Sequence, residues 1–422
     1  MHDRTAIAAR QDQTQAQPQS PPTVGKNANP RYAALYRHYP TIDYLRRAAR
    51  KRLPHFAFEY GDGGSGKDDA GIKRNWAALD AVELVPRYGI VPSLPPCEVE
   101  LFGRRYAAPI GIAPMGGPAI VWPGADKHLA RAAQRARVPY VLGMAGGATI
   151  EEIAEIAPDV GWFQLYRAAN NDHAIGFDLL QRAAATACNA LILTLDVPVR
   201  TTRAREVVVG LGGAFRPDLK MLAQMALSPS WTAALVKNGI PRFASLRSYA
   251  GANPSINDVI EFARREMGGA FTWEEVAKYR DRWKKPLIVK GILHPQDAEK
   301  AVSLGVDGLI VSNHGGRQIE ALPAAIDALP AIVRQVGTRA TVMMDSGIRS
   351  GADVVRAYAL GASAAFPGKA FLWGLGALGE EGASHVIDLL IEETQAAFGQ
   401  LGAKTLQEAR SVVIRHNGAM HF

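Results

Sequence analysis

The chain has 422 residues, of which 48% are apolar and 21% are charged, a composition typical of a soluble globular protein with a sizeable core. Its formal net charge of +8 would suit an anionic partner, but the sequence contains no RNP, zinc-finger or helix-turn-helix signature, so we expect no nucleic-acid binding. No run of roughly 18 apolar residues predicts a membrane-spanning helix, and the N-terminal stretch lacks a secretory apolar region, which favours a cytoplasmic protein.

Residues 1–30 differ from the rest of the chain because they are rich in Gln, Pro, Ala and Ser. Such a segment cannot bury enough apolar surface to order itself, so we predict a disordered tail followed by a single domain over residues 31–422. The two cysteines, Cys97 and Cys188, belong to no CxxC or Cys/His cluster. We therefore expect reduced structural thiols and no metal site.

The first predicted helix begins after Thr41, which would serve as its N-cap. One face is apolar and would pack on the domain, with Ile42, Leu45, Ala49 and Leu53. The other face is basic, with Arg46, Arg47, Arg50, Lys51 and Arg52. A charged face of this kind usually indicates a solvated surface, and a membrane surface is the alternative.

From residue 109 onward, short β-rich runs alternate with longer helical stretches. The predicted strands are 109–114, 140–144, 161–166, 190–196, 286–291, 308–313, 341–347 and 364–369. These runs are almost continuously apolar, as expected for strands that are covered on both faces. Eight successive β-then-α units predict an α/β fold, a closed (β/α)₈ TIM barrel. An open doubly wound sheet is the weaker alternative because no GxGxxG turn follows the first strand.

The segment between the fourth and fifth predicted strands is much longer than a connecting loop and helix require. Residues 197–271 therefore form an insertion. Loops that follow barrel strands lie on the catalytic face, so we expect this insertion to be a lid or docking surface over the active site.

Polar residues cluster at the carboxyl ends of the predicted strands. They are Gln164, Tyr166, Thr194, Asp196, Lys290, Ser312, Asn313, His314 and Asp345. A single residue of this kind is usually structural, but so many on one rim of a barrel predict an active site.

The last two units end in the glycine-rich segments DSGIRSG at 345–351 and PGKAF at 367–371. Glycines before a helix allow backbone N–H groups to approach a phosphate, and Arg349 and Lys369 add positive charge. These segments predict a phosphate site between the last two strands.

The segment SNHGGRQ at 312–318 resembles the signature of the FMN-dependent 2-hydroxy acid dehydrogenases and oxidases, a family that includes glycolate oxidase, lactate dehydrogenase and mandelate dehydrogenase. Further matches are IAP at 112–114, FQLY at 163–166, LTLD at 193–196 and IVKG at 288–291, so that the resemblance extends from about residue 32 to 410. It implies FMN as cofactor, the oxidation of a small (S)-2-hydroxy acid to the 2-oxo acid, and a homotetramer.

The resemblance also implies roles for individual residues. His314 matches the catalytic base, Asp196 the carboxylate that stabilises its protonated form, and Lys290 the lysine near the N1–C2 edge of the flavin. Tyr166 completes the catalytic set. The substrate-binding residues implied are Tyr60, Tyr166, Arg203, His314 and Arg317. Arg200 and Arg205 are neighbours that could take the place of Arg203.

The FMN contacts implied by the resemblance come from all parts of the barrel. They are Ala113, Pro114, Met115, Gly116, Gln164, Thr194, Lys290, Ser312, Asp345, Ser346, Gly347, Arg349, Gly368 and Lys369. Three positions depart from the family pattern. Lys369 stands where many members have arginine, Gly143 where many have a serine that contacts the flavin, and Gly116 where oxidases commonly have alanine.

The insertion resembles the corresponding segment of membrane-associated mandelate and lactate dehydrogenases at residues 228–243 and 268–276. This implies a dehydrogenase that is peripheral on the cytoplasmic face of the inner membrane and passes electrons to a quinone. In residues 217–243 we expect apolar anchors and an interfacial Trp231, surrounded by cations, to contact an anionic membrane surface. The alternative is a lid packed on the barrel rim.

Other functions are compatible with parts of the sequence. The first alternative is a soluble 2-hydroxy acid oxidase that produces H₂O₂, or a lactate-monooxygenase-like enzyme. The second is a Schiff-base aldolase that uses Lys290, and the third is a non-catalytic basic protein.

Overall fold

The computed structural model describes residues 30–89, 94–199, 201–211, 213–214 and 216–422. The predicted tail therefore lies outside the described residues, except for its last residue. Before the barrel the chain forms helices α1 (Pro30–His38), α2 (Ile42–Arg52), α3 (His55–Asp62), the 3₁₀ turn η1 (Lys67–Asp69) and α4 (Ala70–Asp80).

The centre of the molecule is a seven-stranded parallel sheet with the strand order β10-β9-β8-β7-β6-β5-β4. The strands are β4 (Tyr140–Gly143), β5 (Gly161–Leu165), β6 (Leu191–Thr194), β7 (Leu287–Ile292), β8 (Gly308–Val311), β9 (Thr341–Asp345) and β10 (Ala365–Phe366). Each corresponds to a predicted strand, and nearly all of their residues are buried, in agreement with the continuous apolar runs.

The first predicted strand, 109–114, forms no regular strand but closes the barrel. Ile110 bridges to Ala365 of β10, and Ile112 bridges to Tyr140 of β4, both in parallel. The Gly111 amide donates to the Ala365 carbonyl at 3.0 Å, and the Val141 amide donates to the Ile112 carbonyl at 3.2 Å. The two edges of the sheet are thus joined, and the fold is the predicted TIM barrel.

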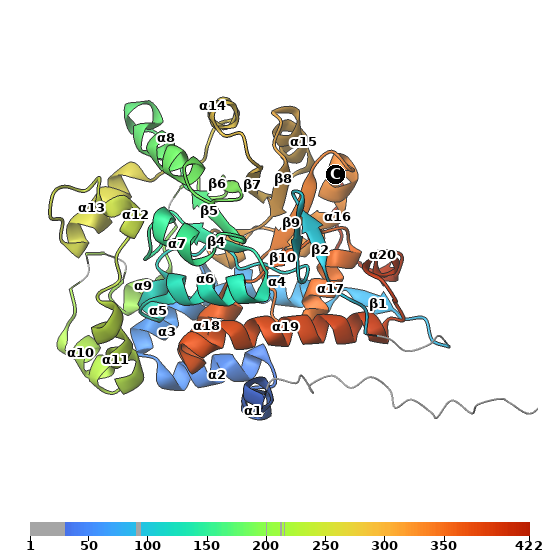
Figure 1. Cartoon of the computed structure of the whole chain (residues 1–422), viewed down its shortest axis with the longest axis horizontal. Coiled ribbons are helices and arrows are strands. Elements are labelled where there is room, and N and C mark those ends of the chain that lie inside the picture. The colour runs from blue at the N-terminus through green and yellow to red at the C-terminus, as the bar shows by residue number, and fades with distance from the viewer. Residues whose placement is uncertain (1–29, 90–93, 200, 212, 215) are drawn as a thin grey trace, which may run out of the picture.

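Helices alternate with the strands and cover the outside of the sheet (Figure 1). They are α5 (Pro118–Val121), α6 (Ala125–Ala136), α7 (Ile150–Ile156), α8 (Asn170–Ala184), α14 (Trp273–Arg282), α15 (Pro295–Ser303), α16 (Ala325–Val336), α17 (Gly351–Ala359), α18 (Lys369–Leu378) and α19 (Glu380–Gln400). Capping boxes begin two of them, with Thr149 and Glu152 at α7 and Thr272 and Glu275 at α14.

Short elements complete the chain. Strand β1 (Glu83–Val85) pairs with β11 (Val413–Arg415), and β2 (Val99–Leu101) pairs with β3 (Arg104–Tyr106), both antiparallel. Helix α20 (Leu406–Ala409) precedes β11.

Helix α2 begins after Thr41 and buries Ile42, Leu45 and Ala49, as predicted. Its basic face, however, is only partly solvated. The Arg46 guanidinium binds Asp62 and stacks on two tryptophans, while Arg52 donates to the hydroxyl of Ser230 at 2.9 Å. Two of the five basic side chains therefore attach α2 to the barrel and to the insertion.

The insertion folds into helices along one side of the molecule (Figure 1). They are α9 (Ala204–Val208), α10 (Leu219–Ala226), α11 (Pro229–Asn238), α12 (Ala244–Arg247) and α13 (Ile256–Glu266). No helix in the described part of the chain is long and apolar enough to cross a membrane.

The prediction that Trp231 is an interfacial anchor is wrong. Its side chain is buried, its indole N–H donates to the Val121 carbonyl at 3.0 Å, and its ring packs edge-on against Phe56. Met221 is buried as well. Trp231 holds α11 on α3 and α5 because its apolar surface gains more from packing there than from exposure. Other apolar side chains of the segment do face outward, namely Leu219, Leu222, Leu227, Val236 and Ile240.

Candidate active site

A histidine–carboxylate pair lies at the carboxyl ends of the strands. His314 follows β8 and Asp196 follows β6, and the His314 Nδ1 atom lies 2.9 Å from the Asp196 Oδ1 atom. On the other side of the ring, the Tyr166 hydroxyl is 3.5 Å from Nε2. Because Nδ1 is engaged by the carboxylate, Nε2 is the ring nitrogen available to exchange a proton.

His314 is held in a left-handed backbone conformation, with φ of 59°. Its amide donates to the Ser312 hydroxyl at 3.0 Å, and the Ser346 hydroxyl accepts from the amides of Asn313 and Gly315 at 3.2 and 3.0 Å. Such a conformation costs about 1–3 kcal/mol and persists where its surroundings fix it. The loop after β8 is therefore fixed by hydrogen bonds from the ends of β8 and β9.

Lys290 pairs with the same Asp196 carboxylate and belongs to a buried ionic network. Its ammonium group donates to the Ser312 hydroxyl at 2.8 Å, and it forms ion pairs with Asp196 at 3.4 Å and Asp345 at 3.2 Å. Burial lowers the pKa of Lys290, but the two carboxylates outweigh it and raise the pKa above its ordinary value. Lys290 is therefore a permanent cation.

The same network sets the charges of the histidine pair. Burial opposes ionisation of Asp196, but His314 and Lys290 lower the pKa of its carboxyl group well below the ordinary range. Burial lowers the pKa of His314 below its ordinary value of 6.5, although the Asp196 carboxylate acts in the opposite direction. At neutral pH the imidazole is therefore neutral and able to accept a proton, with an anion beside it to stabilise the product.

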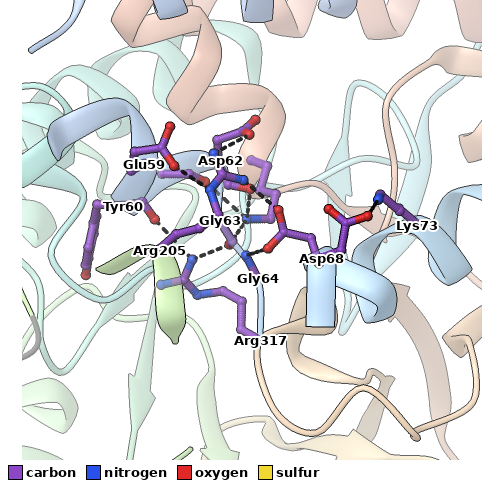
Figure 2. A network of polar contacts seen from close by, with 12 residues as sticks. Glu59, Tyr60, Asp62, Gly63, Gly64, Asp68, Lys73, Arg205 and Arg317 are labelled. Carbon is purple, nitrogen blue, oxygen red and sulfur yellow. Dashed lines mark hydrogen bonds and ion pairs between the residues drawn. The ribbon is translucent and has the colours of Figure 1, made fainter. Parts of the chain in front are cut away.

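Two arginines also line the cavity and share one carboxylate. The Arg203 Nη1 atom is 3.2 Å from the Glu206 Oε1 atom, and Arg317 donates to the same oxygen. Arg317 also donates to the carbonyls of Tyr60 and Gly63 at 3.1 and 2.8 Å. In Figure 2 its guanidinium lies below the Tyr60–Gly64 turn. Two guanidinium groups this close suit the capture of an anion.

Arg205 has a structural role, and Arg200 lies outside the described residues. The Arg205 guanidinium binds the carboxylates of Glu59 and Asp62 (Figure 2) and also that of Asp69. It does not line the active-site cavity. Of the two that are described, Arg203 and Arg205, the structure brings Arg203 to the cavity.

The cavity has a volume of about 170 Å³, and nearly all predicted site residues line it. The exceptions are Gln164, Asp196 and Ser312, which are behind the cavity wall. The Gln164 side chain donates to the Thr194 hydroxyl at 2.9 Å, and the Ser312 hydroxyl binds Lys290. These residues position the groups that line the cavity. Tyr60 also lines it, and its hydroxyl donates to the Gly116 carbonyl at 2.6 Å.

The two glycine-rich turns form the far end of the cavity. Gly347 has φ of 94°, and a Cβ atom there would come within 2.9 Å of Leu79, so only glycine fits. Arg349 stacks on Trp76 and binds Asp80 at 2.8 Å, and its buried Nε atom, which forms no hydrogen bond among the described residues, lies 3.8 Å from the Asp353 carboxylate. Because Arg349 lines the cavity, it brings a positive charge to this turn, as a phosphate site requires.

Lys369 is less suited to a phosphate than the sequence predicts. Its ammonium group donates to the carbonyls of Gly61, Asp62 and Gly63 at 3.1, 3.0 and 2.7 Å, at the end of α3. All three donors are therefore engaged. Burial, and then the charge of Arg317, lower the pKa of Lys369 well below its ordinary value.

The groups that line the cavity nevertheless match the chemistry of FMN. Lys290 is a cation that would stabilise the anionic edge of a reduced flavin, and Arg349, beside the glycine-rich turn of Gly347, is a cation that would bind the phosphate. Part of the wall is formed by the backbone of residues 113–116 and by Gly368, where an added Cβ would meet nothing closer than 3.6 Å.

Some residues of the site were not predicted. Glu206 could have been found, since it stands three residues after Arg203, a spacing at which helical side chains pair. Asn75 exchanges two side-chain hydrogen bonds with Asn313 and thereby fixes the loop of His314. No local pattern indicates Asn75, because it comes from α4, far away in the sequence.

Comparison with known proteins adds independent information. The sequence profile of the FMN-dependent dehydrogenase family matches residues 49–416. An L-lactate dehydrogenase of Ectopseudomonas mendocina (strain ymp) is 36% identical over 372 residues, which cover 88% of this chain and 97% of the relative.

Two solved structures are similar in fold. That of the monotopic membrane protein (S)-mandelate dehydrogenase superposes with a TM-score of 0.82 at 32% identity, over 89% of this chain and 99% of its own. A mandelate oxidase with (S)-4-hydroxymandelic acid gives a TM-score of 0.76 at 33% identity, over 90% of this chain and 100% of its own. The range matched by the family profile includes every site residue named above.

Proposed function

The chain belongs to the FMN-dependent dehydrogenase family, and we propose that it oxidises an (S)-2-hydroxy acid to the 2-oxo acid and passes the electrons to a membrane quinone. FMN-dependent oxidation of a 2-hydroxy acid follows from the family and from relatives named for L-lactate and mandelate. The observation that carries the proposal for the site is the His314–Asp196 pair, 2.9 Å apart, at a cavity that His314, Arg203 and Arg317 line together.

FMN, when bound, accepts the two electrons that the hydroxy acid loses. We assign its ring edge to Lys290, its ring to the backbone of residues 113–116, and its phosphate to Gly347, Arg349 and the backbone of Gly368. Lys369 supports this end of the site indirectly, by holding the carbonyls at the end of α3.

The chain's own residues bind the substrate and move its proton. Arg203 and Arg317 hold the substrate carboxylate, with help from Tyr60. A carboxylate held in this way orients the α-carbon toward the flavin. The His314 Nε2 atom accepts a proton, and Asp196 stabilises the imidazolium that results. This role is the same whether the proton leaves the α-carbon or the hydroxyl group.

The charge state of Lys290 argues against the Schiff-base aldolase considered above. A Schiff-base lysine must be deprotonated to attack a carbonyl group. The neighbouring carboxylates raise the pKa of Lys290 instead, so that its amine has no free electron pair near neutral pH.

We propose that the outward-facing apolar side chains of the insertion dock on an anionic membrane at the cytoplasmic face. Leu219 and Leu227 are 85% and 84% exposed, and the same segment carries Lys220, Lys237 and Arg242. Exposed apolar side chains among cations suit the headgroup region of a membrane. This location would bring the protein to its quinone. A single domain over residues 31–422 and assembly as a homotetramer are further proposals.

Sedimentation with vesicles tests the location. The protein should sediment with vesicles that contain phosphatidylglycerol at low salt, and the double variant Leu219→Glu, Leu227→Glu should stay in solution. As a control, Tyr88→Glu adds a negative charge at an exposed position shortly after β1, and this variant should still sediment, because β1 lies on the other side of the molecule from α10 and α11 (Figure 1). If the wild type stays in solution and turnover in air releases H₂O₂ rapidly, the protein is a soluble oxidase.

A further inference from the structure

A second and larger cavity lies between the insertion and the barrel. Its volume is about 440 Å³, within the range of about 300–1,000 Å³ that is usual for small-molecule sites. Its walls are mainly apolar and come from α3, α5 and the insertion, with Phe56, Ile120, Met225, Leu235 and Ile260 among them. No residue assigned above to the substrate or the flavin lines it, apart from Tyr60.

The two ends of this cavity have different surroundings. Its inner end borders the active site, since Tyr60 lines both cavities and Gly117 follows the backbone segment assigned to the flavin ring. Its outer end is formed by Leu222 and Ile240, which are 48% and 54% exposed and belong to the surface proposed to dock on the membrane. The cavity thus connects that surface with the active site.

We propose that this cavity binds the quinone that accepts the electrons. The inference rests on the proposed function, which requires an acceptor from the membrane. A quinone dissolved in the bilayer would enter between Leu222 and Ile240 without crossing water, and its ring would reach Tyr60 beside the flavin site. The hydroxy acid loses two electrons and two protons to become the 2-oxo acid, and the quinone gains two electrons and two protons to become the quinol. The reaction therefore balances without another reactant.

The lining favours a quinone over the side chain of a large substrate. The hydroxy acid is an anion from the aqueous phase, and its carboxylate binds at Arg203 and Arg317 in the first cavity. Glu206 lies between the two cavities, because it lines the second and pairs with both arginines of the first. The charge of Glu206 is compensated by these arginines, and apart from Arg242 and Arg264 the walls beyond it are mainly apolar, which suits a neutral quinone with an apolar tail.

Adjacent residues of α11 provide a matched pair of variants. Leu235 lines the cavity, whereas Val236, the next residue, is 82% exposed and does not. In Leu235→Trp an indole would occupy the space of the ligand, so kcat/KM for decylubiquinone should fall by about tenfold or more. In Val236→Trp it should stay at the wild-type value. Ile260→Trp, on α13, blocks the cavity from another side and should reproduce the effect.

The two half-reactions separate this inference from the proposed function. Anaerobic bleaching of the flavin by the hydroxy acid, and turnover with ferricyanide, should be alike in all these proteins. If no hydroxy acid bleaches the flavin of the wild type, the proposed function fails. If bleaching occurs but Leu235→Trp and Ile260→Trp reduce decylubiquinone normally, the quinone site is wrong.

Direct labelling gives a readout that does not depend on turnover. A photoreactive azidoquinone should attach to peptides that contain the lining residues of the cavity, within 56–60, 117–120 and 206–267, in the wild type and in Val236→Trp, and much less in Leu235→Trp. Labelling elsewhere would overturn the proposal. A second result would also overturn it: Leu235→Trp and Ile260→Trp could slow flavin bleaching by mandelate or 2-hydroxyoctanoate but not by lactate. The cavity would then hold the substrate side chain.

Discussion

The substitution Asp196→Asn tests how the site uses its central ion pair. It preserves the shape of the side chain but removes the negative charge 2.9 Å from the His314 Nδ1 atom. A hydrogen bond to a charged group contributes about 1.5–3 kcal/mol, and this stabilisation is realised when the imidazole becomes charged. If it is lost in the transition state, the rate constant for flavin reduction should fall by about 10- to 150-fold.

The pH dependence of flavin reduction gives a second readout of Asp196→Asn, with a predicted direction. His314 acts as a base when neutral, so flavin reduction rises as pH increases through its pKa, which lies below 6.5 in the wild type. The Asp196 carboxylate raises the pKa of His314, so Asp196→Asn should lower this pKa further. The rate constant for flavin reduction should then begin to fall only at lower pH than in the wild type, and its maximum at high pH should be smaller. Lys290 keeps its ion pair with Asp345, so FMN should stay bound.

Anaerobic stopped-flow measurement of flavin absorbance between pH 4.5 and 8, a range from about two units below to about 1.5 units above an ordinary histidine pKa, records both effects. The absorbance before mixing controls for flavin content. A reduction rate within about twofold of the wild type, or an acid limb that moves to higher pH, would refute the role of Asp196.

Four further substitutions test other parts of the site. Glu206→Gln removes the anion that both active-site arginines share. Steady-state KM and kcat for the hydroxy acid should therefore both fall by about threefold or more. A raised KM would contradict this role. Arg349→Met should weaken FMN binding by about tenfold in an ultrafiltration assay. Lys369→Met should mainly lower the free energy of unfolding, by about 1–3 kcal/mol, because it removes the hydrogen bonds to the carbonyls at the end of α3. Equal loss of FMN in the two variants would be evidence against the phosphate assignment. Gly291→Ala should destabilise the protein and slow flavin reduction, because a Cβ at φ of 102° would come within 2.4 Å of the Asp196 Cβ, and unchanged thermal unfolding would show that the loop can move.

The barrel could be predicted from the sequence because its strands are buried on both faces and therefore appear as continuous apolar runs. Residues 109–114 show the limit of that signal. They are apolar and lie between two strands, but they form only bridges at Ile110 and Ile112, since hydrogen bonding to both neighbours depends on the closure of the whole barrel.

Side chains at strand ends could be placed on the active-site rim, but their partners could not. The ammonium group of Lys369 has three carbonyl partners at the end of α3, which is more than 300 residues away in the sequence. The packing of the insertion could not be predicted from the sequence either. Trp231 and Leu219 belong to one amphipathic segment, and only the packing of α11 on α5 determines that the first is buried and the second exposed.

The central claim is that His314 removes a proton from a 2-hydroxy acid bound beside FMN. Anaerobic mixing of the flavin-loaded protein with glycolate, lactate, mandelate or 2-hydroxyoctanoate tests it most directly. At least one of these acids should bleach the flavin of the wild type, and His314→Gln should retain FMN but reduce it about 10²-fold or more slowly, the usual contribution of general base catalysis. A wild-type protein that binds no FMN, or a His314→Gln variant that is reduced at the wild-type rate, would contradict the claim.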